Sequence, residues 1–146
     1  MRPRLALPIC LAVVIPVVAP AAVGQVAARA FEPYEVVRAA LAADRLDGVA
    51  AQAAVLAPLA DELAGAEAKA AAERLARAAD LKAARDAFGA LSRLLVPKFR
   101  AAKLTGVLAF ECSMVKLPWA QRGEAVQNPY MGKAMLTCGI PLKDKQ

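Results

Sequence analysis

The residues whose types could do chemistry gather near the C-terminus. Beyond residue 30, the cysteines and methionines of the chain are Cys112, Met114, Met131, Met135 and Cys138. Cys112 and Met114 are two positions apart, so in an extended segment their side chains leave the same face. Met135 and Cys138 are three apart, so in a helical turn they also share a face. Together the two pairs would place two thiols and two thioethers around one point.

Thiolate and thioether donors favour Cu(I) or Ag(I). The chain contains no histidine, which argues against a standard zinc site. A metal would have to displace the thiol protons of Cys112 and Cys138, so we expect affinity to fall in acid. Met131 lies four positions before Met135 and would add a third thioether or fill a gap in the core.

The same spacing is compatible with chemistry that involves no metal. Two cysteines in an exported protein often form a structural disulfide, and isolated methionines often fill gaps in a core. A Cys112–Cys138 disulfide therefore stays open beside the soft-metal site. A thiol redox couple is a third interpretation, although the chain has no Cys-x-x-Cys motif.

Several function classes are disfavoured by what the sequence does not contain. Without histidine there is no Ser-His-Asp triad, no Cys-His nucleophile pair and no HExxH zinc site. The sequence also has no phosphate-binding loop and no paired carboxylates suited to acid-base work. We therefore predict that the protein is not an enzyme.

The first thirty residues have the layout of a secretory signal peptide. Arg2 and Arg4 precede an apolar run over 5–23, and small residues follow it. Three prolines interrupt the run, which argues against a membrane helix. We expect cleavage after Ala30, with Gly24 as the alternative, export to the periplasm or beyond, and no stable membrane insertion afterwards.

The basic excess of the chain belongs partly to this leader. The formal net charge is +6 for the whole sequence, and it falls to +3 when the three arginines of residues 1–30 are removed. The remaining Lys and Arg residues do not cluster with aromatic residues as a nucleic-acid groove requires. We predict no nucleic-acid partner.

The elements that must position the sulfur atoms begin with an alanine-rich region over 31–103. Its periodicity predicts four amphipathic helices, and none of them can bury its apolar stripe alone. We expect Pro33 in the first turn of the first helix, Asp47 as the cap of the second and Asp80 as the cap of the fourth. The fold class predicted is all-α, an up-and-down four-helix bundle.

Some positions in these helices are expected to face the core. In the second helix the inner stripe is Val49, Ala53, Leu56, Ala60 and Leu63. In the fourth it is Leu81, Ala84, Phe88, Leu91 and Leu95. Pro58 is expected to kink or restart the second helix, and Pro97 to end or bend the fourth.

The composition changes in the C-terminal segment, 104–146. Residues 107–112 have the content of a short strand, and the prolines and glycines that follow mark loops. We expect a short, irregular Cys/Met segment, with one or two short strands, packed on the bundle. Trp119 and Tyr130 are expected to be packing anchors rather than ligands.

Several of these stretches together resemble a bacterial family of exported helical domains of unknown function. That family occurs alone or attached to Cus-type heavy-metal efflux adaptor proteins. The matching pieces of the C-terminal segment are Cys112-Ser113-Met114, Trp119 and the run Asn128-Pro129-Tyr130-Met131-Gly132-Lys133-Ala134-Met135-Leu136-Thr137-Cys138-Gly139. In the helices the weaker matches are residues 40–44 and 83–92.

The resemblance implies a periplasmic helical bundle with a copper or silver site, connected with efflux or metal tolerance, and an efflux adaptor as partner. Its implied ligands are Cys112, Met114, Met135 and Cys138. This chain departs from the family pattern at two positions. Ser113 replaces the usual proline, and Met131 stands where an aromatic residue is commoner.

Overall fold

The structure is a computed structural model that describes residues 20–143 of the 146-residue chain. Its helices are α1 Pro20–Ala42, α2 Val49–Ala64, α3 Ala66–Ala76 and α4 Leu81–Ala101, followed by the 3-10 helix η1 Gly132–Met135. Its strands are β1 Val107–Glu111, β2 Pro118–Arg122 and β3 Ile140–Pro141. The described part of the chain is therefore mostly helical, with a small sheet near its C-terminus.

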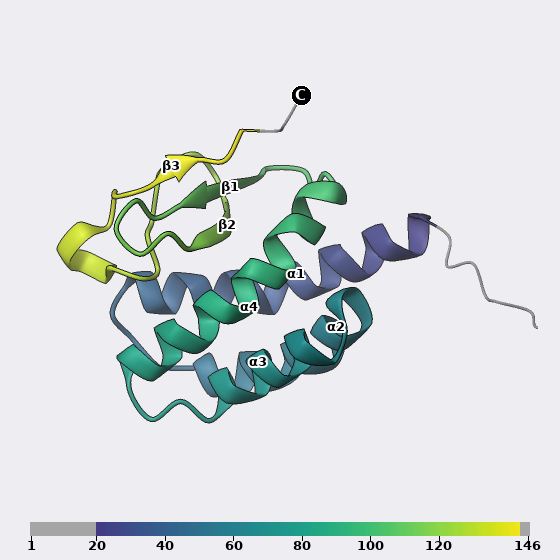
Figure 1. Ribbon diagram of the computed structural model, residues 1–146, viewed down its shortest axis with the longest axis horizontal. Helices are drawn as coiled ribbons and strands as arrows, with labels where there is room; N and C mark the ends of the chain where they lie inside the picture. Colours follow the sequence, from purple (N-terminus) through teal and green to yellow (C-terminus); the bar gives the residue numbers. More distant parts are fainter. Residues whose placement is uncertain (1–19, 144–146) are drawn as a thin grey trace, which may run out of the picture.

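The elements form three layers (Figure 1). The strands lie over α1 and α4, and α2 and α3 lie on the opposite side of these two helices. Each helix packs on the next one along the chain, and α4 returns to pack on α1. Of the four α-helices that the structure describes, only α1 and α4 contact the strands. These two helices therefore position any site in the C-terminal segment.

The all-α prediction is confirmed only in part, because the mostly helical structure also contains a small sheet in the C-terminal segment, for which the sequence predicts one or two short strands. The strands of this sheet are antiparallel in the order β2-β1-β3, with Phe110 opposite Trp119 and Glu111 opposite Ile140. The expected strand is confirmed as β1. Periodicity missed β2 because three consecutive residues of this strand are buried, and it missed β3 because this edge strand has two residues, one of them Pro141.

Two of the helix predictions are confirmed by burial and capping. All five residues of the stripe predicted for α2 are buried. At the start of α4, the Ala83 amide donates to Asp80 Oδ1 at 2.8 Å, as a capping aspartate should. In α4 the predicted stripe is buried from Ala84 onward, and Leu81 is half-buried.

Other boundary predictions are wrong. Pro33 lies well inside α1 because that helix begins at Pro20. Asp47 does not cap α2, since Gly48 is the N-cap residue, with a φ of 76° and no side-chain cap. Pro58 does not restart α2 and Pro97 does not end α4, because both prolines lie inside their helices; the alternative predictions of a kink and a bend stay predictions. Tertiary packing holds helices that these prolines would weaken in isolation.

The N-terminal half of α1 covers part of the predicted leader. Residues 1–19 of that leader lie outside the described residues. Within the described part, Val26, Ala27 and Ala30 are buried in the core. Cleavage after Ala30 would remove all three residues, whereas cleavage after Gly24 would leave them in place. None of the helices in residues 20–143 has both the length and the apolarity that a membrane span requires.

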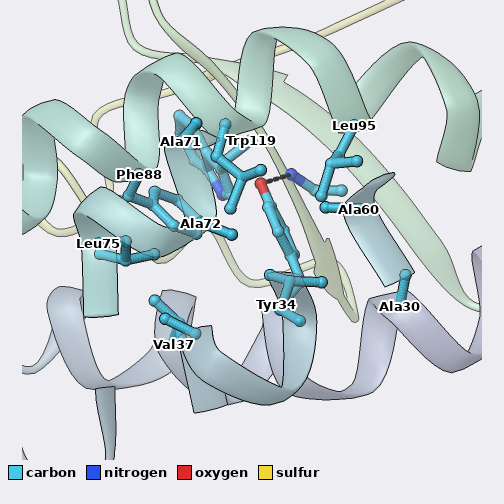
Figure 2. Close-up of a cluster of buried hydrophobic side chains, with 14 of the residues drawn as sticks. Ala30, Tyr34, Val37, Ala60, Ala71, Ala72, Leu75, Phe88, Leu95 and Trp119 are labelled. Carbon is cyan, nitrogen blue, oxygen red and sulfur yellow. Dashed lines mark hydrogen bonds between the residues drawn. The ribbon is translucent and has the colours of Figure 1, made fainter. Parts of the chain in front are cut away.

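A single core joins the helices to the sheet. Tyr34, Phe88 and Trp119 belong to one buried cluster, which Figure 2 shows between α1, α4 and the strands. The Tyr34 hydroxyl lies 2.8 Å from Ser92 Oγ and accepts the Ala120 amide at 3.2 Å. Burial raises the pKa of Tyr34 far above its ordinary value. The hydroxyl therefore stays neutral and ties α1 to α4 and β2.

Candidate metal centre

The structure brings the two cysteines together. Cys112 directly follows β1, and Cys138 lies between η1 and β3. Both thiols are free. Ser113 Oγ lies 3.3 Å from Cys138 Sγ, and the Cys138 side chain is close enough to Cys112 to lower the pKa of the Cys112 thiol. The predicted convergence of Cys112 and Cys138 is thus present in the fold.

The two thiols differ in exposure. Cys112, the first residue of the loop between β1 and β2, has no exposed surface and belongs to the core cluster. Cys138 is half-buried and follows the exposed Thr137. One member of the pair is thus sealed in the protein while the other can be reached from solvent.

The methionines do not share one environment. Met114 is 62% exposed and Met135 is 38% exposed, so both thioethers lie at the surface. Met131 is partly buried and packs against the core, which fits a packing role. In the described part of the chain, no three Cys, Asp or Glu side chains gather as a metal site would need. A metal here would depend on the cysteine pair and the thioethers.

A tight loop carries Cys112 and Met114. The Cys112 amide donates to the Leu117 carbonyl at 3.0 Å, and the Lys116 amide donates to the Cys112 carbonyl at 2.8 Å. These bonds close residues 112–117 into a compact connection between β1 and β2. The Ser113 hydroxyl contacts Cys138 from this loop.

Asn128 connects the segments that carry the two cysteines. It is fully buried, and its Nδ2 donates to the Cys138 carbonyl at 2.5 Å. Its Oδ1 accepts the amides of Tyr130 at 2.8 Å and Met131 at 3.2 Å. Its side chain also acts on the Cys112 thiol and lowers the pKa of that thiol. Asn128 is therefore a positioning residue for both thiols.

Sequence reasoning missed this role of Asn128. An Asn-Pro pair indicates a turn, and the structure has one here, because the Asn128 side chain bonds the backbone two residues on. The spacing did not indicate that the same amide reaches Cys112, sixteen positions earlier. The available signal was the single asparagine of the sequence, placed between the two cysteines.

Several groups act on the acidity of Cys112. Burial raises the pKa of this thiol, but hydrogen bonds with the Val115 backbone, the Asn128 side chain, the Met114 backbone and Cys138 outweigh it. The net effect holds the pKa of Cys112 below its ordinary value. At a given pH, a larger fraction of Cys112 than of a free cysteine is therefore in the thiolate form, which ligates metals and attacks electrophiles.

A polar cluster, here named the Asp44–Arg85 junction, fixes the segment between Asn128 and η1. Arg85 Nε donates to the Pro129 carbonyl at 2.9 Å, and its terminal nitrogen donates to Asp44. Asp44 also accepts the Lys133 amide at 3.0 Å. The Arg85 guanidinium, with the Lys133 amide, lowers the pKa of Asp44. Gly132 has a φ of 56° and leaves no room for a Cβ beside Asp44. The junction thereby ties the start of η1 to α1 and α4.

The aromatic residues pack as predicted. Trp119 is fully buried and stacks on Phe110 with a centroid distance of 5.4 Å. The Tyr130 hydroxyl donates to the Pro118 carbonyl. Gly139 fits against Trp119, because a Cβ there would lie 2.4 Å from the ring. This close approach fixes the backbone directly after Cys138.

Comparison of the chain with protein-family models, with curated proteins and with solved structures found no match. The function is therefore argued from the geometry and chemistry of the cysteine pair.

Proposed function

We propose that the protein binds a soft metal ion, Cu(I) or Ag(I), as cargo in the periplasm, and that it is not an enzyme. The observation that carries the proposal is the contact between the Cys112 and Cys138 side chains, two soft donors that the chain brings together from distant positions. The lowered pKa of Cys112 supports the same proposal, because a metal displaces the thiol proton.

The exposed methionines fit a role in handing over the ion. In this proposal Met114 and Met135 supply neutral thioethers beside the thiolate pair. Both are reachable from solvent, so an acceptor could exchange ligands without opening the core. The cargo would be buffered or passed to a heavy-metal efflux adaptor, as the family resemblance implies. Met131 is left out of the ligand set, because it packs on the core.

The arrangement of the helices belongs to the same proposal. We infer an up-and-down bundle, since each helix packs on its successor and α4 packs on α1. In this arrangement α1 and α4 form a platform that supports the segment with the cysteine pair. The alternative function is an exported helical interaction module in which Cys112 and Cys138 form a structural disulfide and no metal binds.

The test is a competition for Cu(I) with a chromophoric chelator under reducing, oxygen-free conditions. The full chain carries Cys10→Ser so that Cys112 and Cys138 are its two thiols. We expect one Cu(I) per chain, and loss of that binding in the further double variant Cys112→Ser, Cys138→Ser. A Met131→Leu variant is the matched control and should bind as the parent does.

Two results would count against the proposal. Equal binding by the double variant would show that the cysteines are not ligands, and no binding by the parent would remove the metal altogether. Alkylation of the protein isolated without reductant, followed by mass spectrometry, tests the alternative. A constitutive disulfide would leave neither cysteine available for alkylation.

A further inference from the structure

The cysteine pair has an asymmetry that metal binding does not require. Cys112 is sealed in the core, whereas Cys138 is half-buried beside exposed residues. An external reagent can therefore reach Cys138 directly but can reach Cys112 only after a local opening of the fold.

The surroundings of Cys138 keep it next to Cys112. Ser113, the residue after Cys112, contacts the Cys138 sulfur at 3.3 Å. Asn128 holds the Cys138 carbonyl at 2.5 Å and also contacts the Cys112 thiol. Gly139 fits against Trp119 on the other side. Any group attached to the Cys138 sulfur would thus remain within reach of Cys112.

We propose that the pair is a site of thiol–disulfide exchange in which Cys138 is the attacking cysteine and Cys112 is the resolving one. The co-reactant is a low-molecular-weight disulfide. The Cys138 thiolate attacks one sulfur of that disulfide, its S–S bond breaks, and one thiol leaves with a proton. The Cys112 thiolate then attacks the Cys138 sulfur, which releases the second thiol and forms the Cys112–Cys138 bond. Two protein thiols are oxidised and one external disulfide is reduced to two thiols.

The exchange also regulates the site, in a step that rests on the proposed function. A disulfide has no thiolate to offer, so oxidation would remove both charged ligands and release the metal. Reduction would restore the binding form. The order of attack does not depend on metal, because it follows from the burial of Cys112 and the accessibility of Cys138.

The experiment uses glutathione disulfide as the probe and the metal-free full chain with Cys10→Ser. With Cys112→Ser added, we expect one glutathionyl group to accumulate on Cys138. With Cys138→Ser added instead, Cys112 should react at least about 100-fold more slowly, since it must wait for local opening. With both cysteines present, the mixed disulfide should be transient and the internal disulfide should be the product.

Intact-mass measurements over time separate these species, and the same variants unfolded in urea control for reactivity. In urea the two single-cysteine variants should react at similar rates. Equal rates in the folded proteins, or a stable mixed disulfide when both cysteines are present, would overturn the proposal. Cu(I) competition by the reduced protein is measured separately, so failed exchange with intact metal binding is distinguishable from failed metal binding.

Discussion

Asn128 is a single residue that fixes the segment carrying Cys138 relative to the segment carrying Cys112. Its amide nitrogen binds the carbonyl of Cys138, and its oxygen binds the amides of Tyr130 and Met131. The side chain also reaches the thiol of Cys112. Residues that orient metal ligands in this way often affect affinity nearly as much as the ligands do.

Asn128→Asp should weaken Cu(I) binding while keeping the shape of the side chain. The substitution removes the donor to the Cys138 carbonyl and places a negative charge beside the Cys112 thiol, which raises the pKa of that thiol. We expect the Cu(I) dissociation constant to rise by about 10–100-fold. The measurement is chelator competition, with the exposed neighbour Thr137→Ala as control. Unchanged affinity in Asn128→Asp would contradict the assigned role.

The acidity of Cys112 predicts a pH dependence. Its folded pKa lies below the ordinary value of 9.0, so between these two values the unfolded chain binds more protons and stability rises with pH. This contribution is fully present above 9.0 and is lost as the pH falls through the folded pKa. Cu(I) affinity should decline over the same range, because protons compete for the thiolate.

The measurement is a titration of thiolate absorbance in the full chain with Cys10→Ser and Cys138→Ser, which leaves Cys112 as the thiol observed. The folded protein should form thiolate at a lower pH than the same chain in denaturant. Coincident titration curves would show that the contacts of Cys112 do not outweigh its burial.

At the scale of helices and strands, the sequence pattern predicted the features that depend on neighbouring residues alone. The stripe of α2, the Asp80 cap and strand β1 follow from side-chain period and capping chemistry, and the structure contains all three. The sheet as a whole could not be predicted, because β3 exists through its pairing with β1 and has no pattern of its own. The start of α1 was predicted wrongly from Pro33, since packing keeps the helix continuous through this proline.

The same division applies to the candidate site. The proximity of Cys112 and Cys138 could be predicted from their residue types and from the turns between them. The exposure of Met114 and the burial of Cys112 could not be predicted, because they depend on how the loop between β1 and β2 closes. The Asp44–Arg85 junction could not be predicted for a similar reason, since its partners come from the turn after α1, from α4 and from the C-terminal segment.

Gly132→Ala should loosen this junction and the element that carries Met135. A Cβ at Gly132 would lie 1.8 Å from Asp44 Oδ1, and the residue also has a positive φ. Gly123→Ala is the matched control, with a φ of 77° and no atom within 4 Å of its added Cβ. Both variants carry about 1–2 kcal/mol of left-handed backbone strain.

Thermal unfolding and Cu(I) competition distinguish the two glycine variants. Gly132→Ala should unfold at a lower temperature than Gly123→Ala and bind Cu(I) more weakly, because it must displace the start of η1 from Asp44. If both variants behave alike, backbone strain accounts for the whole effect and the junction does not position the site.

At the scale of the whole molecule, the C-terminal segment and the helices fold as one body. Arg85 reaches the Pro129 carbonyl, Leu117 packs against Gly89, and Ser92 and Ala120 share the Tyr34 hydroxyl. Three of these residues, Arg85, Gly89 and Ser92, fall in the stretch 83–92 of α4. That stretch forms the face of α4 on which the cysteine segments rest, so changes in the helices should reach the site.

The shared core includes the first turns of α1 and predicts where a leader can be removed. Val26, Ala27 and Ala30 are packed in the shared core, so a chain that begins at Phe31 lacks part of it. Burial of one valine side chain contributes about 1.5–3 kcal/mol. A chain of residues 31–146 should therefore be less stable than one of residues 25–146 by at least about 2 kcal/mol.

Denaturant unfolding of the two chains measures this difference, and N-terminal sequencing of the protein after export gives the natural start. If a leader is removed, burial favours cleavage after Gly24 over cleavage after Ala30, the site that the sequence alone favours. A start at Gln25 keeps the three buried residues, and Ala22 supplies the small residue that signal peptidase requires. A start at Phe31 with undiminished stability would mean that the first turns of α1 add nothing to the core. In that case the helix from Pro33 onward would suffice to support the cysteine pair.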